Sequence, residues 1–120
     1  ELLLPYAQTD AEAALMLSMY YCDPRGDGSV NECQQPRKSE ELVQRTAREL
    51  DSADAYYYLG SGYAEGKWGT TDGPRALACY REAIKRGDLN SLRPLTWWTK
   101  KGQTPAGEAQ CLPATAPAGS

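Results

Sequence analysis

A pair of helical segments occurs twice along this chain, and this repetition restricts its fold more than any other feature of the sequence. A shift of 42 positions superposes the first segment on the third, matching Glu12 with Asp54, Ala13 with Ala55, Leu17 with Leu59, Ser18 with Gly60 and Tyr21 with Tyr63. A shift of 36 positions superposes the second segment on the fourth, matching Val43 with Cys79 and Ala47 with Ala83. Repetition at this period predicts an all-α fold, an αα-hairpin solenoid of two repeats.

Capping patterns and apolar periodicity place the two helices of the first repeat. Thr9 and Glu12 form a capping-box pattern, which predicts a helix of about twelve residues that ends before the turn-rich stretch 23–28. A second helix is expected after Pro36, with Ser39 as its N-cap. The predicted apolar faces comprise Ala13, Met16, Leu17, Tyr20 and Tyr21 in the first helix and Leu42, Val43, Ala47 and Leu50 in the second.

The second repeat is followed by a short capping helix and a tail. A third helix is expected to begin near Ser52, and a fourth to run from Pro74 to Gly87, its C′ residue. A fifth is expected over residues 92–101, where Pro94 fits only in the first turn. We therefore predict a helical domain over residues 1–102 and a Pro- and Ala-rich tail, with boundaries at 10–51 and 52–87 for the repeats, 88–102 for the cap and 103–120 for the tail.

The chain contains four cysteines, and an even number in so short a sequence indicates disulfides. A metal site built from all four thiolates and a set of free thiols are the weaker alternatives, since no C-x-x-C spacing is present. Of the three pairings we favour Cys22–Cys33, which closes a turn-rich loop, with Cys79–Cys111; the two bonds would contribute roughly 3 and 4 kcal/mol. Disulfides predict a periplasmic or secreted protein, from which we expect an export signal to have been removed.

The absence of one residue type excludes several kinds of active site. There is no His in the chain, which excludes a Ser-His-Asp triad, an imidazole base and a His-ligated metal. The 13 basic and 16 acidic residues give a net charge of -3 without a large basic cluster, which argues against nucleic-acid binding. No apolar run approaches the ~20 residues that cross a bilayer, so no membrane insertion of the mature chain is expected. We predict no enzyme activity and no cofactor.

The loop that begins at Asp23 overlaps part of a calcium-binding pattern. Asp27 and Gly28 occupy the fifth and sixth positions of such a loop. Arg25 occupies the third position, however, and Gln34 occupies the twelfth, where a bidentate Glu is needed. A turn closed by a disulfide is therefore the favoured interpretation, and no metal site is predicted.

The second repeat carries a motif typical of a known family. Residues 55–66 read A-x-x-x-L-G-x-x-Y-x-x-G, and residues 72–87 continue with D-x-x-R-A-L-x-x-Y-x-x-A-x-x-x-G. This pattern resembles the Sel-one-like repeats, short relatives of the tetratricopeptide repeats, and the first repeat resembles them less closely. Trp68, where the family has a loop glycine, and the insertion at 23–35 depart from the pattern. The resemblance covers roughly residues 10–91 and implies a helical adaptor.

Large apolar residues outside the expected core are the candidates for partner binding. In a helix-pair solenoid they lie on the concave face of each first helix, and Tyr and Met are frequent interface residues. One helix pair cannot bury both Tyr56 and Tyr57, so at least one is expected in an interface. Trp97 and Trp98 have a second interpretation, in which they seal the end of the solenoid. The candidate partner-binding residues are Leu15, Met19, Tyr56, Tyr57, Trp68, Trp97 and Trp98.

These observations predict a non-catalytic protein–protein interaction module of the bacterial periplasm or envelope, with one dedicated protein partner. The family resemblance also implies two alternatives. The first is an immunity or inhibitor protein that neutralises an exported toxic effector enzyme. The second is a cell-wall or β-lactam-binding protein. An accessory subunit of a larger envelope assembly is a further form of the interaction module.

Overall fold

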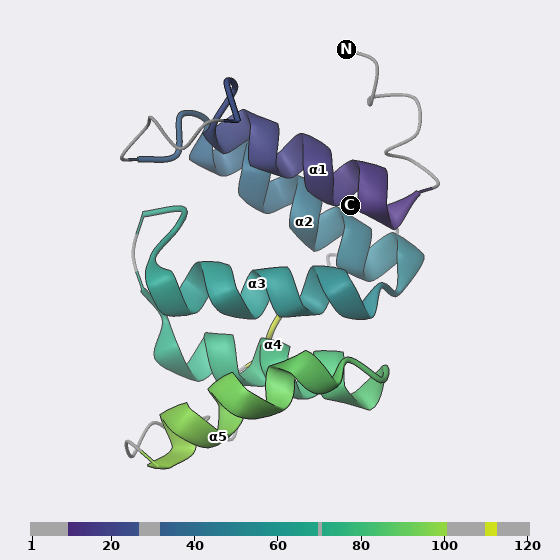
Figure 1. Cartoon of the computed structure of the whole chain (residues 1–120), viewed down its shortest axis with the longest axis vertical. Coiled ribbons are helices and arrows are strands. Elements are labelled where there is room, and N and C mark those ends of the chain that lie inside the picture. The colour runs from purple at the N-terminus through teal and green to yellow at the C-terminus, as the bar shows by residue number, and fades with distance from the viewer. Residues whose placement is uncertain (1–9, 27–31, 70, 101–109, 113–120) are drawn as a thin grey trace.

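The chain folds as a succession of α-helices, each packed against the next (Figure 1). The computed structural model describes residues 10–26, 32–69, 71–100 and 110–112. Within these residues there is no strand, and the expected all-α class is confirmed. The elements in chain order are α1 (Ala11–Cys22), α2 (Pro36–Leu50), α3 (Ala53–Glu65), α4 (Gly73–Lys85), the 3₁₀ turn η2 (Leu89–Ser91) and α5 (Leu92–Lys100).

The first two helices begin at different residues from those expected. Asp10 caps α1, because its carboxylate accepts hydrogen bonds from the backbone N–H groups of Glu12 and Ala13 at 2.9 and 3.3 Å. The prediction that Ser39 caps α2 is wrong. α2 begins earlier, with Pro36 in its first turn, where a missing N–H costs nothing. Ser39 lies inside the helix and is fully buried.

Both helices of the second pair begin directly after a residue whose side chain caps them. The Ser52 hydroxyl accepts from Ala55 N at 3.2 Å at the start of α3, and the Asp72 carboxylate accepts from Arg75 N at 3.1 Å at the start of α4. Gly66, the C-cap of α3, has a left-handed φ of 71°. Gly87, with a φ of 96°, follows the C-cap of α4, as expected.

The main core lies between α2, α3 and α4 and is built from small residues that let the helices approach. Ala55, Gly60 and Ala83 are buried, as predicted from the repeat pattern. A Cβ added to Gly60 would lie 2.7 Å from the ring of Tyr80, so only glycine admits this contact without a shift. A smaller cluster around Ala14 and Leu17 joins α1 to α2.

The expected apolar face of α1 is partly wrong. Met16 and Tyr20 are 46% and 45% exposed, whereas Leu15 and Ser18 are buried instead. The segment is apolar on nearly every side, so periodicity does not select one face. The buried side is the one with small residues such as Ala14, which permit close contact with α2.

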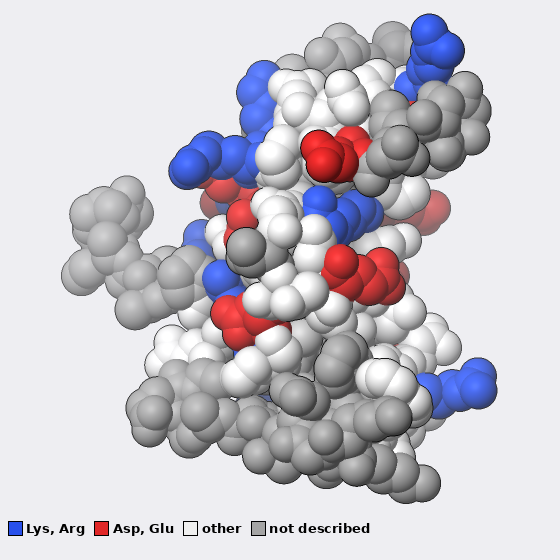
Figure 2. Space-filling model, turned by 90° about the vertical axis from the view of Figure 1, so that its left-hand side faces the viewer, with Lys and Arg blue, Asp and Glu red and all other residues white. Residues whose placement is uncertain are grey.

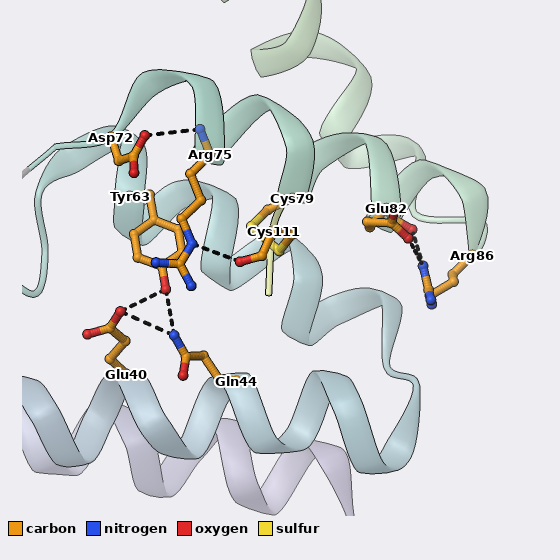
Figure 3. Close-up of a disulfide and its surroundings, with 9 residues drawn as sticks. All are labelled: Glu40, Gln44, Tyr63, Asp72, Arg75, Cys79, Glu82, Arg86 and Cys111. Carbon is orange, nitrogen blue, oxygen red and sulfur yellow. Dashed lines mark hydrogen bonds and ion pairs between the residues drawn. A yellow bond between two sulfur atoms is a disulfide. The ribbon is translucent and has the colours of Figure 1, made fainter. Parts of the chain in front are cut away.

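A polar network joins α2 to the second helix pair (Figure 3). The Tyr63 hydroxyl donates to Glu40 Oε2 at 2.8 Å and accepts from Gln44 Nε2 at 2.9 Å. The guanidinium of Arg75 lies 4.2 Å from the centre of the Tyr63 ring. Burial of the phenol raises the pKa of Tyr63 far above its ordinary value.

Two disulfides are present, in the pairing that the sequence favours: Cys22–Cys33 and Cys79–Cys111. The second bond joins residue 111 to the middle of α4, where Arg75 Nε also donates to the Cys111 carbonyl at 2.8 Å (Figure 3). Such bonds indicate an oxidising, non-cytoplasmic environment. In the part of the chain described, no helix has the length and apolar character needed to cross a membrane.

Candidate partner-binding site

Two open hollows of about 340 and about 660 Å³ adjoin along one side of the molecule. Tyr57 and Asn90 line both, so the hollows form one groove. Met16 and Met19 of α1 lie at one end of this groove, and Trp97 of α5 lies at the other. We call it the α1–α3–α5 groove, after the helices that line it.

Helix geometry and ring packing fix the aromatic wall of the groove. Tyr57 and Ser61 lie four positions apart on α3 and therefore share one face. The Tyr57 ring lies 6.0 Å from the rings of both Tyr58 and Tyr80. Tyr80 is buried, its hydroxyl is 3.4 Å from Ser61 Oγ, and burial raises its pKa. The half-buried ring of Tyr57 is therefore packed against the uncharged ring of Tyr80.

The groove brings together several of the residues predicted to bind a partner. Met19 is 41% exposed and Trp97 is 53% exposed, and Tyr57 lies between them. Leu15 also borders the groove, but it is only 5% exposed and offers little surface to a partner. The small residues of α1 face α2, and this orientation of the helix places Leu15 against the main core.

Tyr56, also a candidate for partner binding, is only 5% exposed and does not line the groove. The Arg86 guanidinium covers its ring at 4.2 Å, and burial raises the pKa of Tyr56. Arg86 in turn bonds the carboxylates of Asp51 at 2.6 Å and Glu82 at 2.7 Å. The hydrogen bond from Arg86 lowers the pKa of Glu82 (Figure 3). Tyr56 therefore anchors α4 to α3.

Trp68 has a packing role away from the groove. Its indole Nε1 donates to Ser39 Oγ at 2.9 Å, and its ring meets Tyr63 edge-on at 5.3 Å. The ring occupies the space that a side chain at Gly62 would need. Trp68 also borders a hollow of about 630 Å³ beside the Cys22–Cys33 disulfide. Trp98 belongs to α5, but its side chain lies outside the described residues.

Met16 of the groove was not among the residues predicted to bind a partner. It was assigned to the buried apolar face of the first helix, yet it lines the groove. Met16 lies three positions before Met19, and residues at that spacing are neighbours on a helix surface. The prediction that Met19 lies on a binding face could therefore have been extended to Met16.

Acidic side chains predominate along the groove. It is bordered by four carboxylates and one guanidinium, those of Glu12, Asp54, Glu65, Asp88 and Arg93. Figure 2 shows another aspect of the charge distribution: on that face, Lys and Arg lie among Asp and Glu and form no continuous basic patch over the described residues.

The part of the calcium-like loop at residues 27–31 lies outside the described residues. At its start, the Asp23 carboxylate accepts from Gly26 N at 3.1 Å, as in a tight turn. Among the described residues, no group of three or more His, Cys, Asp or Glu side chains is placed to hold a metal ion. Comparison of the chain with family models, curated proteins and solved structures finds no match.

Proposed function

We propose that this chain is a non-catalytic protein–protein interaction module that holds a segment of one dedicated partner protein in the α1–α3–α5 groove. The observation that carries the proposal is the meeting of Met19, Tyr57 and Trp97, from three helices, along one groove. Met and aromatic side chains offer a large contact area, and Tyr and Trp dominate binding energy at interfaces. The Tyr57 ring already packs against the Tyr80 ring in the free protein, so binding a partner costs little side-chain entropy at this residue.

We also propose that the helices form an αα-hairpin solenoid of two Sel-one-like repeats, with α5 as the start of a third. The packing of α1 on α2 and of α3 on α4 supports this arrangement. So does the position of the groove, because the first helices of successive repeats line the concave face of a solenoid. The concave face is the surface such proteins use for extended partners.

The proposed location is the bacterial periplasm or envelope. Two disulfides support an oxidising compartment, and Cys79 and Cys111 are both buried in the folded protein. A partner in the same compartment is therefore expected.

Site-specific photocrosslinking in the native cell envelope tests the proposal. A photoreactive phenylalanine analogue replaces Tyr57 or Met19 in the groove, and a matched control replaces Arg45, whose side chain on α2 is 53% exposed. We expect adducts of one mass from both groove positions and none of that mass from position 45. Equal adducts from all three positions, or none from the groove, would refute the proposal.

A second measurement uses the protein identified in the adduct. Calorimetry should show that Tyr57→Ala weakens binding about tenfold or more, as for a central aromatic contact. Tyr20→Ala is the matched control, because Tyr20 on α1 is 45% exposed and does not line the groove. Equal losses from both variants would show that the groove is not the binding site.

A further inference from the structure

We propose that the α1–α3–α5 groove recognises a cationic segment of its partner, in which Lys or Arg side chains alternate with large apolar ones. This inference rests on the proposed function, since it specifies the chemistry of the segment that the same groove holds.

The charge along the groove has one predominant sign. Its border has four carboxylates and one guanidinium, a difference of three negative charges. Glu12 lies in the first turn of α1 and Asp54 in the first turn of α3. The two residues occupy equivalent positions in the two repeats and line the same hollow. They place two carboxylates at that end of the groove.

No cation among the side chains that the structure describes forms an ion pair with these carboxylates. The ion pairs formed among the described residues link Arg45 to Glu49, Lys85 to Glu82, and Arg86 to Asp51 and Glu82, so none includes a carboxylate of the groove. Asp88 is only 8% exposed and accepts hydrogen bonds from Asn90 N at 3.0 Å and Ser91 Oγ at 3.5 Å. Both donors are uncharged, so no cation among the described side chains pairs with this carboxylate.

The aromatic rings of the groove favour the same kind of ligand. Elsewhere in the described structure, the rings of Tyr21, Tyr56 and Tyr63 each lie within 5.6 Å of a Lys or Arg cation. No such cation covers the rings of Tyr57 and Tyr58 among the described residues. A Lys or Arg side chain entering the groove could stack on these rings while its charge faces Glu12 or Asp54.

The apolar residues and the charge of the groove together indicate which kind of protein segment binds there. Met16, Met19 and Trp97 provide contacts for large apolar side chains, which a purely polar cation would not use. An acidic segment would face like charges, which is unfavourable at an interface. A second copy of this chain, itself with a net charge of -3, would bring two acidic grooves together. A cationic, apolar segment satisfies both features.

Fluorescence anisotropy with three labelled peptide libraries tests the inference on the intact, oxidised protein. Leu, Tyr or Trp alternates with Lys or Arg in the first library, with Gln or Ser in the second, and with Asp or Glu in the third. We expect the cationic library to bind at least about tenfold more tightly than the neutral one, with the acidic library weaker still. The preference should fall as salt rises from about 0.02 to about 0.5 M, because screening shortens the range of exposed charges.

Matched charge variants locate the effect. The double variant Glu12→Gln/Asp54→Asn should weaken binding of the cationic library about three- to tenfold. The control double variant Glu32→Gln/Glu41→Gln removes the same charge from exposed residues outside the groove and should leave binding unchanged. An equal loss in both double variants would overturn the inference, because it would reduce the preference to net charge alone.

Two variants of groove residues distinguish a failure of this inference from a failure of the proposed function. If all three libraries bind equally and Tyr57→Ala or Met19→Gln abolishes binding, the groove binds protein segments but the cationic preference is wrong. If neither variant weakens the binding of any library, the groove is not a binding site and the proposed function fails as well. Met19 is 41% exposed, so its replacement provides a test that does not disturb the core.

Discussion

Replacement of Gly62 by alanine should destabilise this protein, although the same change stabilises most helix interiors. Gly62 is buried in α3, and a Cβ added there would overlap Cζ3 and Cη2 of the Trp68 indole. Alanine favours a helix interior over glycine by about 1 kcal/mol. The sign of the effect is therefore decided by what it costs to move the indole.

The contacts of Trp68 set that cost. Its Nε1–H donates to Ser39 Oγ at 2.9 Å, and Ser39 is 1% exposed, so breaking the bond leaves a buried hydroxyl without this donor at a cost of about 1.5 kcal/mol. Losing the edge-on contact with Tyr63 and the surrounding packing costs about another 1.5 kcal/mol. The sum of about 3 kcal/mol exceeds the helical gain, so Gly62→Ala should lower the free energy of unfolding by about 2 kcal/mol.

A double-mutant cycle measured by urea unfolding and far-UV circular dichroism checks this result. The four proteins are the parent chain, Gly62→Ala, Trp68→Ala and the combination of both. In the Trp68→Ala background the indole is gone, so Gly62→Ala should stabilise by up to about 1 kcal/mol, which gives a coupling of about 3 kcal/mol. The reasoning is refuted if Gly62→Ala is neutral or stabilising in the parent chain, or if it has the same effect in both backgrounds.

Three further predictions concern the disulfides and two ionisable residues. Replacing both cysteines of Cys79–Cys111, which are 32 positions apart, should cost about 4 kcal/mol of unfolding free energy, against about 3 for Cys22–Cys33 at a separation of 11. Tyr63→Phe should cost about 1 kcal/mol at neutral pH and reduce the loss of stability above pH 10, because burial raises the pKa of Tyr63, so the unfolded chain releases its proton first. Glu82→Gln should flatten the loss of stability as pH falls below about 4.5, because Arg86 lowers the pKa of Glu82, so the unfolded chain binds its proton first.

Each of these outcomes can be contradicted by the same unfolding measurements. A larger loss from removal of Cys22–Cys33 would show that ring size does not govern the two bonds. An unchanged alkaline profile in Tyr63→Phe would assign the effect to Tyr56 and Tyr80, whose pKa values are also raised by burial. An unchanged acid profile in Glu82→Gln would show that its ion pair with Arg86 does not persist in solution.

The sequence predicted the buried face of α2 but not that of α1, and the difference has a physical reason. α2 alternates charged and apolar residues with a helical period, and its buried Val43 and Ala47 were both predicted. α1 has apolar residues around most of its circumference, so the pattern did not distinguish Leu15, which is buried, from Met16, which is exposed. Only the packing of α1 against α2 makes that choice.

The candidate site was predictable to a similar extent. Residues 56–58 are three consecutive tyrosines, and sequence alone does not say which of them faces inward. The answer depends on Arg86, 30 positions after Tyr56, whose guanidinium covers that ring. The role of Trp68 likewise depends on Ser39, 29 positions earlier, and on the missing side chain at Gly62. Long-range contacts of this kind leave no local pattern.

The Cys79–Cys111 bond has a consequence for the order in which the disulfides form, if the chain meets an oxidising environment with its N-terminus first. Cys22–Cys33 can close as soon as Cys33 appears, whereas Cys79 must wait until a residue 32 positions further along has emerged. In the complete fold, the core that includes Cys111 leaves Cys79 fully buried. The early ring therefore removes the two thiols with which Cys79 could mispair. A polypeptide interrupted before Cys111 would carry Cys79 as a single unpaired thiol.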